Sequence, residues 1–463
     1  MPELLLELFS EEIPARMQAQ AGRNLGRLFT EQLRTAGLTP ENLRTFAGPR
    51  RLTLVCDLPA ATESVSDELK GPKTSAPPQA LEGFLRKTGL AREQLTERDG
   101  VLYAVTRREG RATTDLIPAL VEAVVRGFPW PKSMRWGTGT LRWVRPLKRI
   151  LCLFSGAVVP FAIEGIASGD VTEGHRFMGS GLPLTVSGFD DYRRKLRDDF
   201  VLLDAEERKA RILEGASPLC ADAGLELVED AGLMEEVSGL AEWPTPILGT
   251  MDPDFLDLPP EVIRTSMRTH QKYFALRRTG ETDRLAPNFL VVANLEPSDG
   301  GAEVARGNAR VLSARLNDAR FFWDEDRRPG AFEGWLEKLK GVTFHAKLGT
   351  LAERAERIAA LAREIAPLVG ADPELAETAG RLCKADLASQ MVGEFPELQG
   401  VMGGYYARTL GYGGAVADAI RDHYKPVGQG DEVPTAPVTV AVSLADKLDT
   451  LAGFWSIGEK PTG

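Results

Sequence analysis

The chain has 463 residues, of which 43% are hydrophobic and 26% are charged, and its formal net charge is −10. We expect two or three domains, because domains commonly contain about 100 to 200 residues. No apolar run approaches the roughly 20 residues that a membrane-crossing helix needs, and residues 1–9 lack the layout of a secretory signal, so we expect a cytoplasmic protein with no membrane partner.

The cysteines lie far apart and form no Cys-x-x-Cys pair, which argues against a structural zinc site and against a disulfide framework. They are Cys56, Cys152, Cys220 and Cys383. The acidic balance of the chain would ordinarily count against a nucleic-acid partner, but a whole-chain charge hides local patches.

The first expected elements are a strand at residues 4–9 and a helix at residues 15–36, which Gly37 ends. A strand at residues 51–58 follows. Residues 70–78 contain three prolines and no apolar period, which predicts an exposed loop.

Strands dominate the middle of the chain and helices dominate its last third. In order, we expect a helix at 79–88, a strand at 101–107, a helix at 114–127, short strands joined by turns at 141–166, charged helices at 205–239, a strand at 289–293 and helical periods at 334–454. These patterns predict an α+β protein, with a mixed, sheet-rich region of two subdomains at residues 1–330 and an all-helical domain at residues 331–463.

The most informative segment for function is residues 126–149, which contain seven positive charges and no acidic residue. The cations are Arg126, Lys132, Arg135, Arg142, Arg145, Lys148 and Arg149. Trp130, Trp136 and Trp143 lie among them. Cations that neutralise phosphates beside aromatic stacking faces are typical of proteins that bind single-stranded or end-of-helix RNA. The alternative is that the tryptophans belong to the core and the cations to an ordinary solvated face.

A second acid-free segment, residues 264–278, holds the candidate RNA contacts Arg268, His270, Lys272 and Tyr273. The alternative is a strand or hairpin with a charged outer side. A third segment, residues 306–328, carries acids that offset its arginines. It is typical of a salt-bridged helix that ends in an aromatic anchor at residues 321–323.

Nucleotide-binding and hydrolytic motifs are missing from the sequence. There is no Gly-x-x-x-x-Gly-Lys-Ser/Thr loop, no complete dinucleotide turn, no His-Glu-x-x-His and no Gly-x-Ser-x-Gly. The four histidines offer few general bases at neutral pH. We therefore do not expect a self-sufficient ligase or hydrolase, and we expect no cofactor on this chain.

Short segments in the same order along essentially the whole chain resemble the beta subunit of the two-subunit bacterial glycyl-tRNA synthetase. They include Glu-Glu-Ile-Pro at 11–14, Ala-Gly-Pro-Arg-Arg-Leu at 47–52, Met-Arg-Trp at 134–136, Val-Arg-Pro at 144–146, Gly-His-Arg-Phe-Met at 174–178, Glu-Trp-Pro at 242–244, Gln-Lys-Tyr-Phe at 271–274, Pro-Asn-Phe at 287–289, Lys-Ala-Asp-Leu at 384–387, Glu-Phe-Pro-Glu-Leu-Gln-Gly at 394–400 and Ala-Asp-Lys-Leu-Asp-Thr at 445–450. Ordered agreement at so many places is more specific than any one motif.

The resemblance implies a heteromeric enzyme, a heterotetramer, in which the alpha subunit holds ATP, Mg²⁺ and glycine and the beta subunit binds tRNA(Gly). The front region also resembles the tRNA-binding and editing-type module of phenylalanyl-tRNA synthetase. Members of the family continue into a further body and an anticodon-binding domain. The expected phosphate contacts are Lys132, Arg135, Arg142, Arg145, Lys148 and Arg149, with Trp136 as the aromatic partner.

The helical last third resembles an HD domain, whose metal ligands are a histidine, a His-Asp pair and a later aspartate. His345, Asp386 and Asp446 match three of these positions, but Ala385 replaces the histidine of the pair. The resemblance therefore implies a vestigial site without a metal. Two alternatives stay open: a metal-dependent HD-type phosphohydrolase that uses these residues, and a non-enzymatic scaffold that binds only the alpha subunit.

Overall fold

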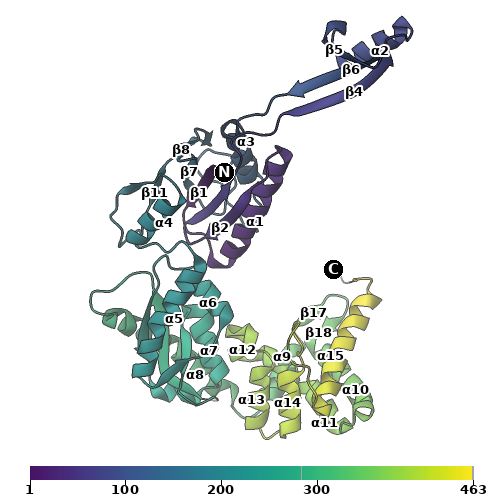
Figure 1. Cartoon of the computed structure of the whole chain (residues 1–463). Coiled ribbons are helices and arrows are strands. Elements are labelled where there is room, and N and C mark those ends of the chain that lie inside the picture. Colours follow the sequence, from purple (N-terminus) through teal and green to yellow (C-terminus); the bar gives the residue numbers. More distant parts are fainter. Residues whose placement is uncertain (283, 461–463) are drawn as a thin grey trace. The chain divides into compact units, whose positions relative to one another are not determined.

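The computed structural model describes residues 1–282 and 284–460, which fold into two compact units (Figure 1). Unit 1 comprises Met1–Pro218, Glu229–Ile247 and Val292–Gly300, and unit 2 comprises Leu219–Val228, Leu248–Val291 and Gly301–Gly463. The expected change from mixed to helical structure at residue 330 falls within unit 2. In the part of the chain that is described, no helix is both long enough and apolar enough to span a membrane.

Unit 1 is built on a seven-stranded sheet with the order β2-β3-β1-β7-β10-β9, in which β8 pairs with β7. Neighbouring strands are antiparallel, except that β10 runs parallel to β7. The strands are β1 (Glu3–Ser10), β2 (Glu41–Ala47), β3 (Arg51–Asp57), β7 (Leu147–Phe154), β8 (Ala157–Val158), β9 (Ala162–Ile163) and β10 (Ile166–Gly169). The predicted strands at residues 4–9 and 51–58 are confirmed.

Helices cover both faces of this sheet because successive side chains of β1 point to opposite sides. Leu4, Leu6 and Leu8 lie in the core beneath α1 (Ala15–Thr35) and α3 (Thr113–Arg126). Leu5 lies in a separate core on the other face, with residues of α4 (Phe189–Asp198). Figure 1 shows α4 and α1 on different sides of the strands. Both predicted helices are confirmed, and α1 gives way at Gly37, whose φ is 80°.

A small insertion in unit 1 forms its own antiparallel sheet, with the order β4-β6-β5, and one helix. Its elements are β4 (Val65–Lys73), α2 (Pro78–Thr88), β5 (Leu95–Arg98) and β6 (Val101–Arg108). The prediction of a loop over residues 70–78 is wrong for its first part, because Lys70 pairs with Tyr103 and Lys73 with Val101. Pro72 falls where the register shifts, and proline is tolerated at such a bulge because it breaks no regular ladder bond.

The rest of unit 1 and the beginning of unit 2 alternate between helices and short strands. They contain β11 (Val171–Glu173), β12 (Pro183–Thr185), α5 (Ala205–Asp222), β13 (Leu225–Leu227), α6 (Ala231–Ser238), β14 (Thr245–Thr250), α7 (Pro260–Thr265), a π-helix (Ser266–Gln271), β15 (Phe274–Arg278), β16 (Leu285–Ala293) and α8 (Ala302–Asp326). β13, β15, β16 and β14 form a four-stranded sheet in that order. The helices expected at 205–239 are therefore interrupted by a strand.

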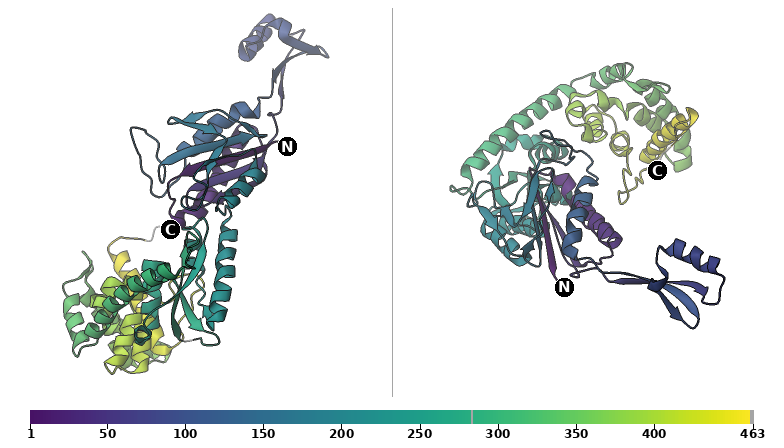
Figure 2. Two further views of the ribbon diagram at one scale, coloured as in Figure 1. Left: turned by 90° about the vertical axis from the view of Figure 1, so that its left-hand side faces the viewer. Right: turned by 90° about the horizontal axis from the view of Figure 1, so that it is seen from above.

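The end of unit 2 is mostly helical, as predicted, and Figure 2 shows its helices in light green to yellow. They are α9 (Ala331–Leu339), α10 (Leu351–Ile365), α11 (Pro373–Leu382), α12 (Gln390–Glu394), α13 (Val401–Thr409), α14 (Gly414–Asp422) and α15 (Pro437–Ser456), with a hairpin of β17 (Thr343–His345) and β18 (Gly349–Thr350). Short 3₁₀ turns lie at Arg92–Gln94, Pro253–Asp257, Ala366–Val369, Ala385–Ala388 and Pro396–Leu398. Met402, Tyr406 and Ile420 are fully buried between these helices. The HD-like character of this region stays a prediction.

Candidate nucleic-acid interface

The cationic strip, residues 126–149, runs from the end of α3 through a loop into β7. Two main-chain hydrogen bonds close this loop: the amide of Met134 donates to the carbonyl of Trp143 at 2.8 Å, and the amide of Trp143 donates to the carbonyl of Met134 at 3.2 Å. The loop therefore has a fixed base and is not a free tether.

One of the three tryptophans in the strip belongs to the core, and the other two are half-buried against it. Trp143 is fully buried, and its ring centroid lies 5.0 Å from that of Trp130 and 5.0 Å from that of Phe128. Trp143 therefore has no face open to a base, and the alternative that placed it in the core is correct. Trp136 is half-buried at the edge of the same core, so its role as an aromatic partner of RNA stays a prediction.

Three cations of the strip already have carboxylate partners. Lys148 Nζ lies 2.7 Å from Glu11 Oε1, and Arg149 Nε lies 2.8 Å from Glu173 Oε1. Arg126 likewise pairs with carboxylates on α3 and on the turn that joins β9 to β10. All three side chains stay partly exposed, and exposed ion pairs of this kind typically contribute about 0 to 1 kcal/mol. Contact between phosphate and Lys148 or Arg149 would therefore have to compete with an existing partner.

The other four cations lie in the exposed loop. Lys132, Arg135, Arg142 and Arg145 are exposed, and no carboxylate of the described residues lies within ion-pair distance of any of them. Arg142 Nε donates to Ser133 Oγ at 3.3 Å, and Arg145 donates to a main-chain carbonyl oxygen. These positive charges therefore remain uncompensated, in a chain whose net charge is −10.

The second segment, residues 264–278, differs from the strip expected there. Tyr273 is only 3% exposed, its ring stacks on Phe289 with centroids 4.8 Å apart, and its hydroxyl donates to Asn308 Oδ1 at 2.5 Å. It cannot offer a stacking face, so that part of the prediction is wrong. The chain enters β15 from a π-helical turn in which only Ser266 and Met267 are buried, and Tyr273 follows that turn with its ring packed on Phe289. Arg268 and His270 are exposed, and their RNA contacts, like that of half-buried Lys272, stay predictions.

The third segment is confirmed as a salt-bridged helix, but the aromatic anchor predicted at residues 321–323 is confirmed only in part, because Phe321 is 58% exposed. α8 is a salt-bridged helix, in which Arg306 pairs with Glu303 at 2.5 Å and Arg327 with Asp324 at 2.7 Å. The aromatic anchor is Trp323, which is 8% exposed.

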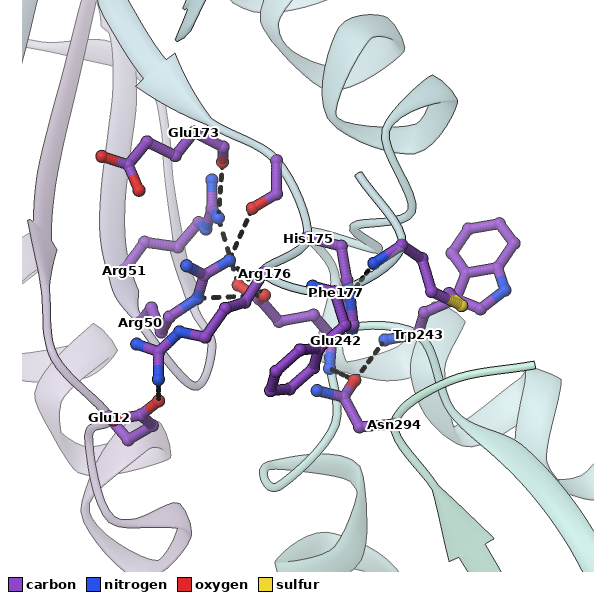
Figure 3. Close-up of polar contacts among 12 residues, drawn as sticks. Glu12, Arg50, Arg51, Glu173, His175, Arg176, Phe177, Glu242, Trp243 and Asn294 are labelled. Atoms are coloured by element: carbon purple, nitrogen blue, oxygen red, sulfur yellow. Dashed lines mark hydrogen bonds and ion pairs between the residues drawn. The ribbon is translucent and has the colours of Figure 1, made fainter. Parts of the chain in front are cut away.

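A buried ionic network lies under the main sheet of unit 1, and the sequence prediction did not include it (Figure 3). Glu242 accepts from Arg50 at 2.6 Å and from Arg51 at 3.1 Å, and Arg51 also lies 3.2 Å from Glu7. None of these side chains is more than 6% exposed. Burial acts to raise the pKa of Glu242, but the two guanidinium groups outweigh it and lower that pKa. The carboxylate is therefore held charged inside the protein.

The network joins segments that lie far apart in the sequence. Arg50 Nη2 donates to the carbonyl of Gly174 at 2.6 Å, and Arg51 Nη2 donates to the carbonyl of Glu173 at 3.0 Å. The amides of Glu242 and Trp243 donate to Asn294 Oδ1 (Figure 3). The segments at 47–52, 174–178 and 242–244, which suggested the family resemblance, thus meet in one place. One feature of the sequence could have indicated this network: Arg50 and Arg51 stand at the start of a strongly apolar strand.

The loop that follows β11 is bound to this network through the carbonyl of Gly174, and it exposes the aromatic ring of Phe177. His175 is 2% exposed. Its Nδ1 accepts hydrogen bonds from the main-chain amides of Phe177 at 3.2 Å and Met178 at 3.1 Å. Arg176 forms an ion pair with Glu11 Oε2 at 2.8 Å. The other carboxylate oxygen of Glu11 contacts Lys148 of the strip. Phe177 is 74% exposed. This loop is therefore rigid at its base and apolar at its tip.

The three expected HD positions do not form a ligand set. Asp386 is fully buried, and its Oδ2 accepts from the amides of Gly400 at 2.6 Å and Gly403 at 3.0 Å. Asp446 is bound to cationic side chains, and His345 accepts from a main-chain amide. Among the residues described, no group of three His, Cys, Asp or Glu side chains could hold a metal ion. The residues present therefore do not fit the metal centre of an HD hydrolase.

A lysine holds the polar groups of this region together. Lys384 Nζ lies 2.8 Å from His423 Nε2, 2.9 Å from Asp446 Oδ2 and 3.8 Å from the centre of the Tyr424 ring. An ammonium group can only donate, so His423 Nε2 accepts and its Nδ1 carries the proton, which it donates to the carbonyl of Ile420 at 2.7 Å. Burial, with the nearby Lys384 charge, lowers the pKa of His423 to about 3.

Comparison with known proteins places the chain among the components of aminoacyl-tRNA synthetases. The model of the family described as glycyl-tRNA synthetase beta subunit matches residues 4–463. The chain belongs to this family, and the resemblance inferred from its short segments is confirmed.

Relatives of the chain include glycine–tRNA ligase beta subunits from several bacteria. The one from Phenylobacterium zucineum is 64% identical over 467 residues, and the match covers all of this chain and 70% of the relative. Those from Dinoroseobacter shibae and Paracoccus denitrificans are each 55% identical, and the matches cover 65% and 69% of the relatives. The chain thus spans about two thirds of the length of these proteins.

Proposed function

We propose that this chain binds tRNA(Gly) and thereby supports ATP-dependent glycylation at an active site on the alpha subunit, where ATP and Mg²⁺ are held. Membership of the family supports a role in glycyl-tRNA synthesis. The observation that carries the RNA-binding part is the set of exposed cations without carboxylate partners on the closed loop of the strip. They are Lys132, Arg135, Arg142 and Arg145.

Uncompensated cations on an acidic protein suit a polyanion for a physical reason. Each phosphate that a lysine or arginine neutralises releases condensed counterions, so log K falls with log salt by about 0.7 to 0.9 per contact. A cation that is already paired with a carboxylate releases fewer ions, because its own partner must first be displaced. The four loop cations therefore contribute most of the salt dependence, and Lys148 and Arg149 contribute less.

The experiment is a titration of the chain with tRNA(Gly) without the alpha subunit, repeated over a salt series. We expect Arg135→Glu with Arg145→Glu to weaken binding and to lower the salt slope by about two, one for each lost contact. The control is Arg306→Glu with Arg328→Glu, which reverses two exposed arginines that are paired on α8 and its end. It should leave the slope unchanged.

A second readout separates RNA binding from the chemistry of activation. With the alpha subunit added, the strip variant should raise the KM for tRNA and leave ATP–pyrophosphate exchange with glycine unchanged. Equal salt slopes for strip and control variants would contradict the assignment of the strip. If the chain bound the alpha subunit but no tRNA, the scaffold alternative would replace the proposal.

The phosphohydrolase alternative is not favoured by the arrangement of its expected residues. Asp386 is engaged by two main-chain amides, and Asp446 by Lys384 and Arg354. Hydrolysis of a phosphate ester that depended on Asp386 and on added Mn²⁺ would revive this alternative.

A further inference from the structure

The last helix of the described fold exposes a continuous apolar stripe. Leu444, Leu448, Leu451 and Trp455 of α15 are 42%, 47%, 52% and 55% exposed. Their spacing of four, three and four residues places them on one face of a helix, as in the seam of a coiled coil. Scattered exposed apolar residues are ordinary, but a stripe at this spacing marks an interaction surface.

The neighbouring face of α15 is already used. Ala441, Val442 and Ala445 are fully buried in the core of unit 2. The apolar surface of α15 is therefore wider than the part that the core of this chain covers. The outer stripe is an addition that the packing of this chain does not explain.

A groove beside the stripe provides room for a partner. Its volume is about 880 Å³, and its apolar lining comes from Ala360 and Leu361 of α10 and from Leu448, Leu451 and Ala452 of α15. Leu448 and Leu451 of the stripe thus form one wall of the groove, a shape that suits a docked helix.

The charges at the rim of the groove favour an apolar partner over a nucleic acid. Arg357 Nε lies 2.6 Å from Asp449 Oδ1, and Arg363 pairs with Glu377. Both arginines of the rim are therefore neutralised within the chain. A polyanion would have to break these pairs and would cover an apolar floor, whereas an amphipathic helix could cover the floor and leave the pairs intact.

The relatives indicate where such a helix comes from. They match this chain along its whole length, but the match leaves 30% of the Phenylobacterium zucineum protein and 35% of the Dinoroseobacter shibae protein uncovered. A segment of the same polypeptide docks at a high effective concentration, so moderate apolar contact is enough to hold it. We propose that the stripe on α15 is the docking site of an amphipathic helix from the part of the full-length beta subunit that lies outside the match.

Thiol labelling can test this proposal directly, because all four native cysteines are buried and should react slowly. Leu448→Cys would be placed in the 463-residue chain and in the same chain joined to the unmatched part of the Phenylobacterium zucineum relative. We expect the rate of reaction with a maleimide to be roughly tenfold lower in the longer protein, since a tenfold shift needs only a modest docking free energy. The matched control is Leu368→Cys, which is 84% exposed and lies outside the stripe, and which should react equally in both proteins.

A second reporter is needed because Leu448→Cys removes an apolar side chain of the stripe and could itself weaken docking. In the longer protein, Trp455→Cys should be protected, and adding Leu448→Glu with Leu451→Glu should restore its fast reaction. Equal labelling of both reporters in the two proteins would overturn the proposal. So would protection that grows with concentration in the 463-residue chain, which would indicate a second copy, or protection that requires the alpha subunit.

Discussion

Unit 1 contains two sets of arginines that the sequence does not distinguish. Arg50 and Arg51 are buried and bound to Glu242, whereas Arg135 and Arg145 are exposed and have no carboxylate partner among the described residues. Both pairs lie in segments that resemble the same family. The first pair fixes the fold, and the second is available to another molecule.

The difference teaches that charge is informative only together with its surroundings. A buried guanidinium requires a matching carboxylate, because transfer of an unpaired charge out of water is very unfavourable. An exposed guanidinium requires none, so selection for binding can leave it unpaired. Removal of a charge should therefore affect stability in the first set and RNA affinity in the second.

The largest effect is expected from Glu242→Gln. This change leaves Arg50 and Arg51 facing a neutral amide in the interior, and removal of one partner from a buried ionic network typically costs about 3 to 5 kcal/mol. The measurement is the free energy of unfolding from urea denaturation. The control is Glu122→Gln, which removes an exposed partner of Arg126 and should change that free energy by less than about 1 kcal/mol. Similar values for the two variants would mean that burial does not separate the two sets.

An intermediate effect is expected from the buried His423, which extends the comparison to unit 2. Its pKa is lowered from the ordinary 6.5 to about 3. Between these two values the histidine is protonated in the unfolded chain and neutral in the folded chain. The contribution of His423 to the free energy of unfolding is fully present above pH 6.5. It decreases as the pH falls, by roughly 2 kcal/mol at pH 5. His423→Gln should remove that part of the pH dependence, as followed by urea denaturation at pH 7 and pH 5. His345→Gln, at a half-buried histidine, is the control and should retain it.

The smallest effect on stability is expected from the exposed set. Arg135→Glu with Arg145→Glu should change the free energy of unfolding by no more than about 0.5 kcal/mol per site, because both side chains are exposed and neither has a carboxylate partner among the described residues. Thermal denaturation of the free chain measures this. A large loss of stability would show that the loop cations hold the fold, and would remove the reason to assign them to RNA.

The regular elements could be predicted because their signals are local. The short apolar run of β1, and the apolar period and terminal glycine of α1, require no knowledge of the rest of the chain. The misses have non-local causes. Residues 70–73 form a strand because β6 lies beside them, and β13 is a strand because β15 pairs with it.

The candidate site was predicted in part, for the same reason. Composition identified the cationic strip, but it could not show which members have partners, because Glu11 and Glu173 are far from Lys148 and Arg149 in sequence. Nor could it show that Trp143 is core, since burial depends on Phe128 and Trp130 around it. The network around Glu242 could not be predicted from the sequence, because three segments that lie far apart along the chain build it.

The position of Lys384 has a consequence for how the helical part of unit 2 responds to its chemical environment. A charge that bridges His423 and Asp446 is here carried by a side chain and cannot dissociate from the protein. Acetylation of this amine, possible only when the chain opens, would abolish the bridge permanently.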